Sequence, residues 1–269
     1  MKKFSLELIL TLVLFFGIFL LAKQVDWIKL LRVNQVRHQT EEKLGELLKE
    51  ILNKDKTACN RWEILRPVDS LLTHLCEANG IKRDMIKISV FYEDEVNAFA
   101  LPGNRIVVYT ALIEATENES ALSGVLAHEL AHLQKRHVMR RLIREMGVAV
   151  LLSAASGGAG ETLTAILKEL TSASYDRSME KEADLTTVKY LTKAQLNTEP
   201  FAALLLKLDD PITPDFLTWM NTHPSGEQRA DDVREQFRDK KPLAFQPVLA
   251  PETWELMKKN TGSLAEIQD

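Results

Sequence analysis

The sequence predicts an α+β fold that is mainly helical and contains one small antiparallel sheet. Apolar residues recur at the 3.6-residue spacing of amphipathic helices along most of the chain, whereas strict alternation occurs only within residues 86–110. The chain has 269 residues, of which 45% are hydrophobic, so it can bury a substantial core. This composition excludes an intrinsically disordered protein.

The charge balance and the cysteine count exclude further classes. The chain has 34 Lys and Arg against 38 Asp and Glu, a formal net charge of −4 without an overall basic field, so we expect no nucleic-acid partner. Only Cys59 and Cys76 are present, too few for a thiolate metal site or a disulfide-dense scaffold. They form one bridge or remain free thiols.

Residues 1–25 are expected to form a membrane anchor. Residues 6–22 are apolar apart from Glu7 and follow Lys2 and Lys3, a layout shared by signal peptides and short anchors. Bulky Leu20 stands where signal peptidase requires a small residue, which favours an uncleaved anchor. The basic residues after the run favour a cytoplasmic body, whereas the signal-like layout favours export, so the sequence alone leaves the sidedness open.

The first half of the chain is expected to form two helices followed by the sheet. Apolar spacing predicts an amphipathic helix over residues 37–53, within a helical lead-in of residues 26–60. Pro67 suits the first turn of a second helix, which Asn79-Gly80 ends. Strands are predicted over residues 86–92, 97–101 and 105–110, with a turn at Pro102-Gly103-Asn104 between the last two.

Helices dominate the second half of the chain. They are predicted over residues 119–146, 161–172, 179–191, 199–208 and 227–239. Residues 147–160 are small, apolar and glycine-rich, which is typical either of a buried helix end with a loop or of a mobile flap beside a site. We assign residues 61–240 to one domain and residues 241–269 to a peripheral tail with a short helix from Glu252.

The strongest local motif is His128-Glu129-Leu130-Ala131-His132, within the helix predicted over residues 119–146. Side chains four residues apart lie on one helix face, so both imidazoles can reach a single metal ion. Glu129 lies beside that face, where its carboxylate can take a proton from an attacking water rather than bind the metal. The alternative, two histidines on a solvated helix, is disfavoured because the surrounding residues are apolar.

A third ligand is expected from the helix predicted over residues 179–191. Glu180 and Asp184 share one face of that helix, and Glu182 points to the opposite side. We therefore expect Glu180 to bind the metal and Asp184 to orient a ligand histidine. The alternative is a charged helix that is simply solvated.

Four motifs together give a more specific indication. They are His128-Glu129-Leu130-Ala131-His132, Glu180-Lys181-Glu182-Ala183-Asp184, Asn97-Ala98-Phe99-Ala100-Leu101-Pro102-Gly103, and Thr222-His223-Pro224 with Arg229. Over residues 61–239 the sequence resembles metallopeptidase family forty-eight, the family of HtpX-type membrane proteases, CAAX prenyl proteases and BepA-like periplasmic proteases. The single apolar segment at residues 6–22 makes it most similar to the BepA-like branch with one anchor.

The resemblance implies a gluzincin-type zinc protease domain. His128, His132 and Glu180 would hold one zinc ion per chain. Glu129 would act as the general base. A substrate peptide would lie along an edge strand, which makes candidate substrate-binding residues of Asn97, Ala98, Phe99 and Ala100; an exposed strand offers backbone pairing with little sequence preference.

By the same resemblance, His223 and Arg229 lie near the zinc ion. An imidazole and a guanidinium are suited to stabilise the oxyanion that forms at a peptide carbonyl, so both are candidate catalytic residues. Alternatively, His223 occupies the open position of the metal and keeps the enzyme latent. His137 is expected to cap or solvate the end of the zinc-binding helix.

We expect a membrane-anchored zinc endopeptidase that cleaves misfolded or unassembled proteins, with its body in the periplasm of a bacterial inner membrane. One alternative is a zinc-stabilised chaperone-like or assembly factor without turnover, which the intact Glu129 disfavours. Another is a membrane adaptor that uses residues 147–160. The sequence leaves the natural substrate and the oligomeric state open.

Overall fold

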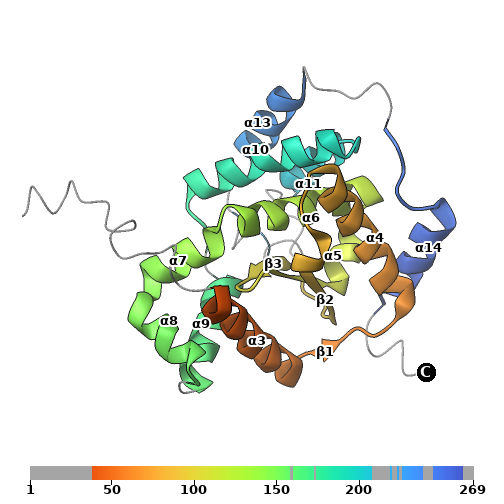
Figure 1. The fold of residues 1–269 in the computed structure, drawn as a ribbon. Coiled ribbons are helices and arrows are strands. Elements are labelled where there is room, and N and C mark those ends of the chain that lie inside the picture. The colour runs from red at the N-terminus through yellow and green to blue at the C-terminus, as the bar shows by residue number, and fades with distance from the viewer. Residues whose placement is uncertain are drawn as a thin grey trace, which may run out of the picture. The chain divides into compact units, whose positions relative to one another are not determined.

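The computed structural model describes residues 38–157, 160–172, 174–207, 219, 223, 226–238 and 245–262. Helices surround one four-stranded sheet in this part of the chain, which confirms the predicted fold class (Figure 1). Residues 40–269 form one compact unit. No helix among the described residues combines the length and apolar character that a membrane crossing requires. The anchor expected at residues 1–25 lies outside the described residues.

The sheet is mixed rather than antiparallel. Its strands are β1 (Thr57–Ala58), β2 (Lys87–Tyr92), β3 (Ala98–Leu101) and β4 (Arg105–Tyr109), in the spatial order β1-β2-β4-β3. The turn after β3 makes an antiparallel hairpin with β4, as predicted, but β4 then lies between β3 and β2 and runs parallel to β2. Alternation along a strand reveals which face is buried, not which neighbour it pairs with, so the sequence did not reveal this order.

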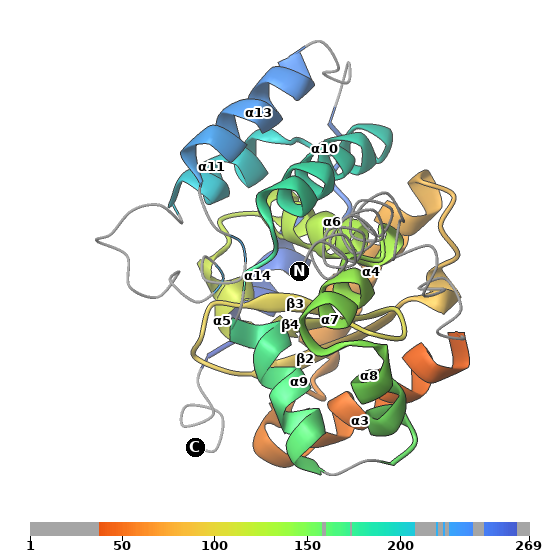
Figure 2. The ribbon, with the colours of Figure 1, turned by 90° about the vertical axis from the view of Figure 1, so that its left-hand side faces the viewer.

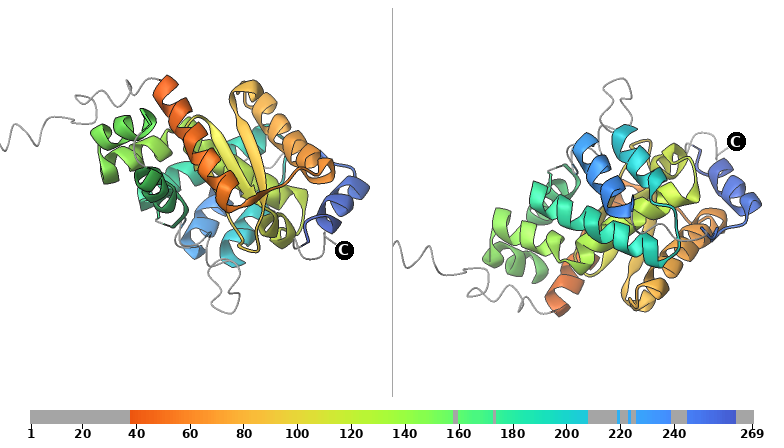
Figure 3. Two further views of the ribbon diagram at one scale, coloured as in Figure 1. Left: turned by 90° about the horizontal axis from the view of Figure 1, so that it is seen from below. Right: turned by 90° about the horizontal axis from the view of Figure 1, so that it is seen from above.

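One helix precedes the sheet, and a second follows its first strand. Helix α3 (His38–Asp55) lies across one face of the sheet, where Gly45 packs so closely on the Pro102 carbonyl that a Cβ would overlap it (Figure 3). Helix α4 is Trp62–Ala78. The expectation that Pro67 lies in the first turn of this helix is wrong, because apolar Ile64 is already buried and extends the helix toward its N-terminus. The short elements η2 (Arg83–Met85) and α5 (Thr110–Ala115) carry little periodicity and were not predicted.

The helix predicted over residues 119–146 is two helices, α6 (Glu119–Gln134) and α7 (His137–Met146). Arg136 has φ 57°, a left-handed conformation that ends α6 and turns the chain into α7. Helix α6 begins with the Asn118 side chain accepting a hydrogen bond from the Ala121 N–H. It lies between the sheet and α10 (Figure 2), and all residues from 121 to 133 are buried.

The remaining elements follow the prediction closely, except that residues 147–160 contain a separate helix. They are α8 (Val148–Ala155), α9 (Gly160–Ser172), α10 (Arg177–Lys193), α11 (Glu199–Lys207), α13 (Glu227–Arg238) and α14 (Pro251–Lys259). Within the stretch 147–160, α8 buries Leu151 but exposes 44% of Leu152, so it is a partly covered surface helix.

The tail expected to be peripheral is packed onto the domain. Helix α14 lies against α4, and Met257 is fully buried. Lys258 Nζ donates to carbonyl oxygens at the end of α5, including that of Thr116 at 2.8 Å. The N–H groups of Val248 and Leu249 donate to the Glu119 carboxylate at 2.9 and 2.8 Å, which ties the tail to the start of α6.

Candidate metal centre

Helices α6 and α10 lie side by side and carry the candidate site. Helix α6 contributes His128, Glu129 and His132, each fully buried. Asp176 caps the start of helix α10: its side chain accepts a hydrogen bond from the Met179 N–H and so fixes the first turn.

The inner face of α10 supplies two buried carboxylates. Glu180 and Asp184 are each 2% exposed, whereas the side chain of Glu182 is 44% exposed. The spacing of the three carboxylates had predicted this division between an inner pair and an outer residue.

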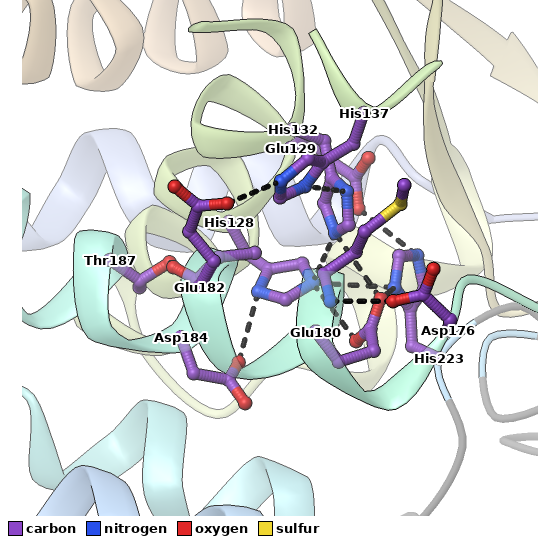
Figure 4. Close-up of polar contacts among 12 residues, drawn as sticks. His128, Glu129, His132, His137, Asp176, Glu180, Glu182, Asp184, Thr187 and His223 are labelled. Atoms are coloured by element: carbon purple, nitrogen blue, oxygen red, sulfur yellow. Dashed lines mark hydrogen bonds and ion pairs between the residues drawn. The ribbon is translucent and has the colours of Figure 1, made fainter. Parts of the chain in front are cut away.

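Four side chains from three parts of the chain converge on one point (Figure 4). His128, His132, Glu180 and His223 each offer one ligand atom, and these atoms all lie within 4.8 Å of one another. His132 Nε2 lies 3.0 Å from His128 Nε2 and 3.3 Å from Glu180 Oε1. His223 Nδ1 lies 3.3 Å from His128 Nε2 and 3.0 Å from Glu180 Oε1.

Four of the six separations, at 3.0–3.3 Å, are close to the edges of a coordination tetrahedron. Four ligands bonded to one ion at about 2.0–2.1 Å in tetrahedral geometry stand about 3.3 Å apart. Two imidazoles facing each other through unprotonated Nε2 atoms would repel without a proton or cation between them. The donor set of imidazoles and a carboxylate is one that binds zinc and other transition metals.

The electrostatics of the cluster also favour a cation. Although burial alone would raise it, His223 and Arg229 hold the pKa of Glu180 well below its usual range, so this carboxylate is ionised. Burial alone would lower the pKa of His128, but hydrogen bonds with Asp184 and Glu180 raise it to about 9. In the polypeptide alone His128 therefore holds a proton where a cation would replace it.

Both α6 histidines turn their second ring nitrogen toward a partner. His128 Nδ1 lies 3.1 Å from Asp184 Oδ1, as expected for a carboxylate that orients a ligand imidazole. His132 Nδ1 lies 3.0 Å from Nδ1 of His137. The expectation that His137 caps or solvates the helix end is wrong, because the turn at Arg136 directs its ring inward and leaves it fully buried.

Glu129 occupies a position beside the ligand atoms rather than among them. Its Oε1 lies 3.4 Å from His223 Nε2. Burial raises the pKa of Glu129 from 4.5 to about 8, although the charge of a protonated His128 and the nearby Trp219 and Ala100 N–H groups oppose the shift. A buried carboxylate with a pKa near neutrality can both accept and release a proton at neutral pH.

Arg229 is fully engaged by neighbouring protein groups. Its Nε and one terminal nitrogen donate to the two carboxylate oxygens of Asp184 at 2.7 and 2.9 Å. The other terminal nitrogen donates to the His223 carbonyl at 2.9 Å and lies 3.0 Å from Glu180 Oε2. The guanidinium therefore joins α13, α10 and the segment that carries His223.

The edge-strand residues Asn97, Ala98, Phe99 and Ala100 lie next to α6. Strand β3 is an edge strand, as expected, but it is buried rather than exposed, because α6 and α9 pack against it. The Asn97 carbonyl accepts a hydrogen bond from the Tyr109 N–H of β4 at 3.0 Å. Since backbone groups alternate in direction along a strand, those of Ala98 and Ala100 point away from β4.

Three side chains of the centre were not identified from the sequence. They are His137, Trp219, whose ring lies 4.8 Å from that of His223, and Tyr175, whose ring lies 4.1 Å from that of His132. None belongs to a helical stripe that includes the metal-binding motif. The turn at Arg136 directs His137 to the centre, and Tyr175 lies in the segment before α10, placements that helical periodicity does not predict.

Comparison with known proteins agrees with the candidate metal-binding side chains of this site. Residues 66–236 match the model of peptidase family M48. The β-barrel assembly-enhancing protease of Escherichia coli (strain K12) is 31% identical over 187 residues, which are 63% of this chain and 38% of that protein. The mitochondrial metalloendopeptidase OMA1 of Schizosaccharomyces pombe is 24% identical over 235 residues, 84% of this chain and 70% of that protein.

Metalloprotease YcaL of Escherichia coli (strain K12) is 26% identical over 169 residues, 59% of this chain and 65% of that protein. The chain thus spans 34–38% of the length of the β-barrel assembly-enhancing proteases of Yersinia pestis and Escherichia coli.

Proposed function

The chain belongs to peptidase family M48, and from that membership we propose that it is a zinc-dependent endopeptidase. The observation that carries the proposal is the buried cluster of four ligand atoms within 4.8 Å, with Glu129 beside it. His128, His132 and Glu180 hold the ion, one per chain. Asp184 orients the ring of His128 through the contact of 3.1 Å.

Peptide hydrolysis in this site depends on proton transfer by Glu129. When bound, zinc lowers the pKa of a water molecule and polarises the substrate carbonyl. Glu129 accepts the proton of the attacking water as the new C–O bond forms. It then gives that proton to the amine nitrogen as the C–N bond breaks. A pKa of about 8 suits both steps at neutral pH.

His223 has two roles in this proposal. In the resting enzyme it would be a fourth ligand beside the three named above, because its Nδ1 lies 3.0–3.3 Å from ligand atoms of His128 and Glu180. Three protein ligands leave a catalytic position open, whereas four close it. Displacement of the His223 ring opens the site, and from its displaced position the imidazole stabilises the oxyanion.

Arg229 acts as a positioning residue rather than by touching the substrate. Its hydrogen bond to the His223 carbonyl anchors the segment that must move, and its pair with Asp184 supports the orientation of His128.

Substrate peptides pair with β3 as an added strand. The outward backbone groups of Ala98 and Ala100 are the groups that such a strand would meet, next to Glu129. Because β3 is buried in this structure, with α6 and α9 packed against it, its outer edge must be uncovered before a peptide can bind there. Proline at Ala98 or Ala100 removes a backbone donor, so we expect a raised KM for peptides in both variants. Because the Ala100 N–H also lies close to Glu129, kcat should stay nearly unchanged only in Ala98→Pro. An unchanged KM in both variants would contradict this docking mode.

The substrates in this proposal are misfolded or unassembled proteins, by analogy with relatives whose name refers to β-barrel assembly. We further propose that residues 1–25 anchor the chain in a bacterial inner membrane, with the catalytic body in the periplasm. Protease treatment of intact spheroplasts tests the sidedness: a periplasmic body is digested, and a protected body would contradict the assignment.

The activity is tested with full-length protein in detergent micelles. Wild type and Glu129→Gln are compared for casein cleavage and bound zinc, with Glu199→Gln as a control for loss of a carboxylate on the surface. We expect about one zinc ion per chain in all three and cleavage only by the wild type and the control. A Glu129→Gln protein that cleaves casein as fast as the wild type would refute the proposal.

If all three proteins bind zinc and none cleaves, His223 is replaced next. Cleavage by His223→Ala would support the closed resting state. Continued inactivity would favour the alternative of a zinc-stabilised chaperone-like or assembly factor.

A further inference from the structure

His137 lies behind the candidate ligand His132, on the side away from the ligand atoms (Figure 4). The two Nδ1 atoms are 3.0 Å apart, and His137 Nε2 lies 3.2 Å from Glu182 Oε2. His137 is fully buried, whereas the Glu182 side chain is 44% exposed. The three side chains therefore form a row from the candidate metal centre to the protein surface.

One assignment of protons satisfies every contact in this row. His132 Nε2 faces the ligand cluster and must present its lone pair to a metal ion, so its proton is on Nδ1. That N–H donates to His137 Nδ1, which leaves the proton of His137 on Nε2. The second N–H then donates to the Glu182 carboxylate, which accepts.

The surrounding groups hold this row in place. Glu182 is paired with Lys135 Nζ at 3.0 Å and lies 3.8 Å from Arg140, so its carboxylate contacts the end of α6 and the first turn of α7. The Tyr175 ring packs on His132 with a centroid separation of 4.1 Å. The left-handed Arg136 residue lets the chain return His137 to a ring only five positions earlier.

We propose that His137 and Glu182 are positioning residues that fix the tautomer and the orientation of His132 and so strengthen its bond to the metal. The inference rests on the proposed function, since it requires His132 to be a ligand. His128 is oriented by Asp184 directly, whereas His132 reaches its carboxylate through a second imidazole. Such outer hydrogen bonds are typically worth 10–100-fold in metal affinity.

The test measures zinc affinity of the full-length protein in detergent by competition with a chromophoric chelator. The variants are His137→Ala, His137→Gln, Glu182→Ala and His132→Ala. Glu199→Ala is the matched control, because Glu199 is a half-exposed carboxylate at the start of α11 that pairs with Arg234 of α13 at 2.6 Å. The visible spectrum of the cobalt-substituted proteins reports the geometry of the ligand set, and thermal unfolding without metal confirms folding.

We expect His137→Ala to weaken zinc binding about 10–100-fold and to alter the cobalt spectrum. His137→Gln, whose amide oxygen can accept from His132 Nδ1, should recover part of that loss. Glu182→Ala should weaken binding less than His137→Ala, and Glu199→Ala should not change it. Glu182 is at the surface, so its variant keeps the test decisive should the His137 variants fail to fold.

Failure of this inference can be distinguished from failure of the proposed function. If the His137 and Glu182 variants bind zinc within twofold of the wild type while His132→Ala loses it, the inference is overturned and the proposed function stands. If His132→Ala binds zinc as tightly as the wild type, the proposed ligand set is wrong and the inference falls with it.

Discussion

Replacing Arg229 with methionine tests whether its guanidinium holds the buried carboxylates of α10 in place. Arg229 donates to both oxygens of Asp184 at 2.7 and 2.9 Å and lies 3.0 Å from Glu180. Methionine fills a similar volume but leaves both carboxylates buried without their cation. The variant therefore removes the charge while disturbing the packing little.

The expected loss of stability is large. Removing one partner from a buried ion pair costs about 3–5 kcal/mol. A domain of this size changes its Tm by about 2–4 °C per kcal/mol, so the Tm should fall by about 6–20 °C. Arg229→Lys keeps the charge but not the two-pronged contact, and we expect an intermediate loss.

The assay is thermal unfolding by circular dichroism, in excess zinc and again in chelator. A double variant with Asp184→Asn should lose less than the sum of the two single losses, because the residues interact directly. An unchanged Tm in Arg229→Met, with kcat alone reduced, would refute the positioning role. That result would favour instead the sequence-based prediction that Arg229 stabilises the oxyanion.

Three further predictions concern stability. Burial raises the pKa of Glu129 from 4.5 to about 8, so folding takes up a proton between these pH values and wild-type stability falls as pH rises across that window. In chelator at pH 7, Glu129→Gln should therefore be about 3 kcal/mol more stable than the wild type. Equal urea midpoints for the two proteins would contradict this. Although burial opposes it, hydrogen bonds from Ser178 and the Met179 N–H lower the pKa of Asp176 to about 2, so its stabilising effect is present above pH 3.8 and is lost as pH falls through about 2. Asp176→Ala should cost about 1 kcal/mol at pH 7 and clearly less at pH 2, and a pH-independent difference would count against the cap. A Cβ at Gly124 would lie 2.5 Å from Phe201 Cβ, so Gly124→Ala should lower the free energy of unfolding by about 1–3 kcal/mol, as measured in urea. A Cβ at Gly160 would meet nothing within 4 Å, so Gly160→Ala should not destabilise the protein. Equal effects of the two variants would contradict the close packing at Gly124.

The sequence predicted those parts of the molecule that depend on local periodicity. The face of α10 that buries Glu180 and Asp184 could be predicted from residue spacing alone, because a helix repeats every 3.6 residues. The start of α10 follows from the Asp176 side chain, which caps it. The same reasoning applies to the boundaries of α9 and α11, whose predicted and observed ends differ by one residue or none.

Features that depend on tertiary contacts could not be predicted in this way. The parallel pairing of β2 with β4 depends on which strand occupies the centre of the sheet. The burial of His137 depends on the left-handed conformation of Arg136, which nothing in a local pattern indicates. The family resemblance placed Arg229 near the metal, but its partners on α10 became clear only when α13 and α10 were seen together.

The most direct test of the central claim is a crystal structure of the zinc-loaded Glu129→Gln protein with anomalous data recorded at the zinc edge. We expect a single ion within about 2.0–2.2 Å of His128 Nε2, His132 Nε2 and a Glu180 oxygen, with His223 as the fourth ligand of the resting enzyme and residue 129 beside the ion and not bound to it. An ion held by other residues, or no anomalous peak between α6 and α10 at saturating zinc, would contradict it.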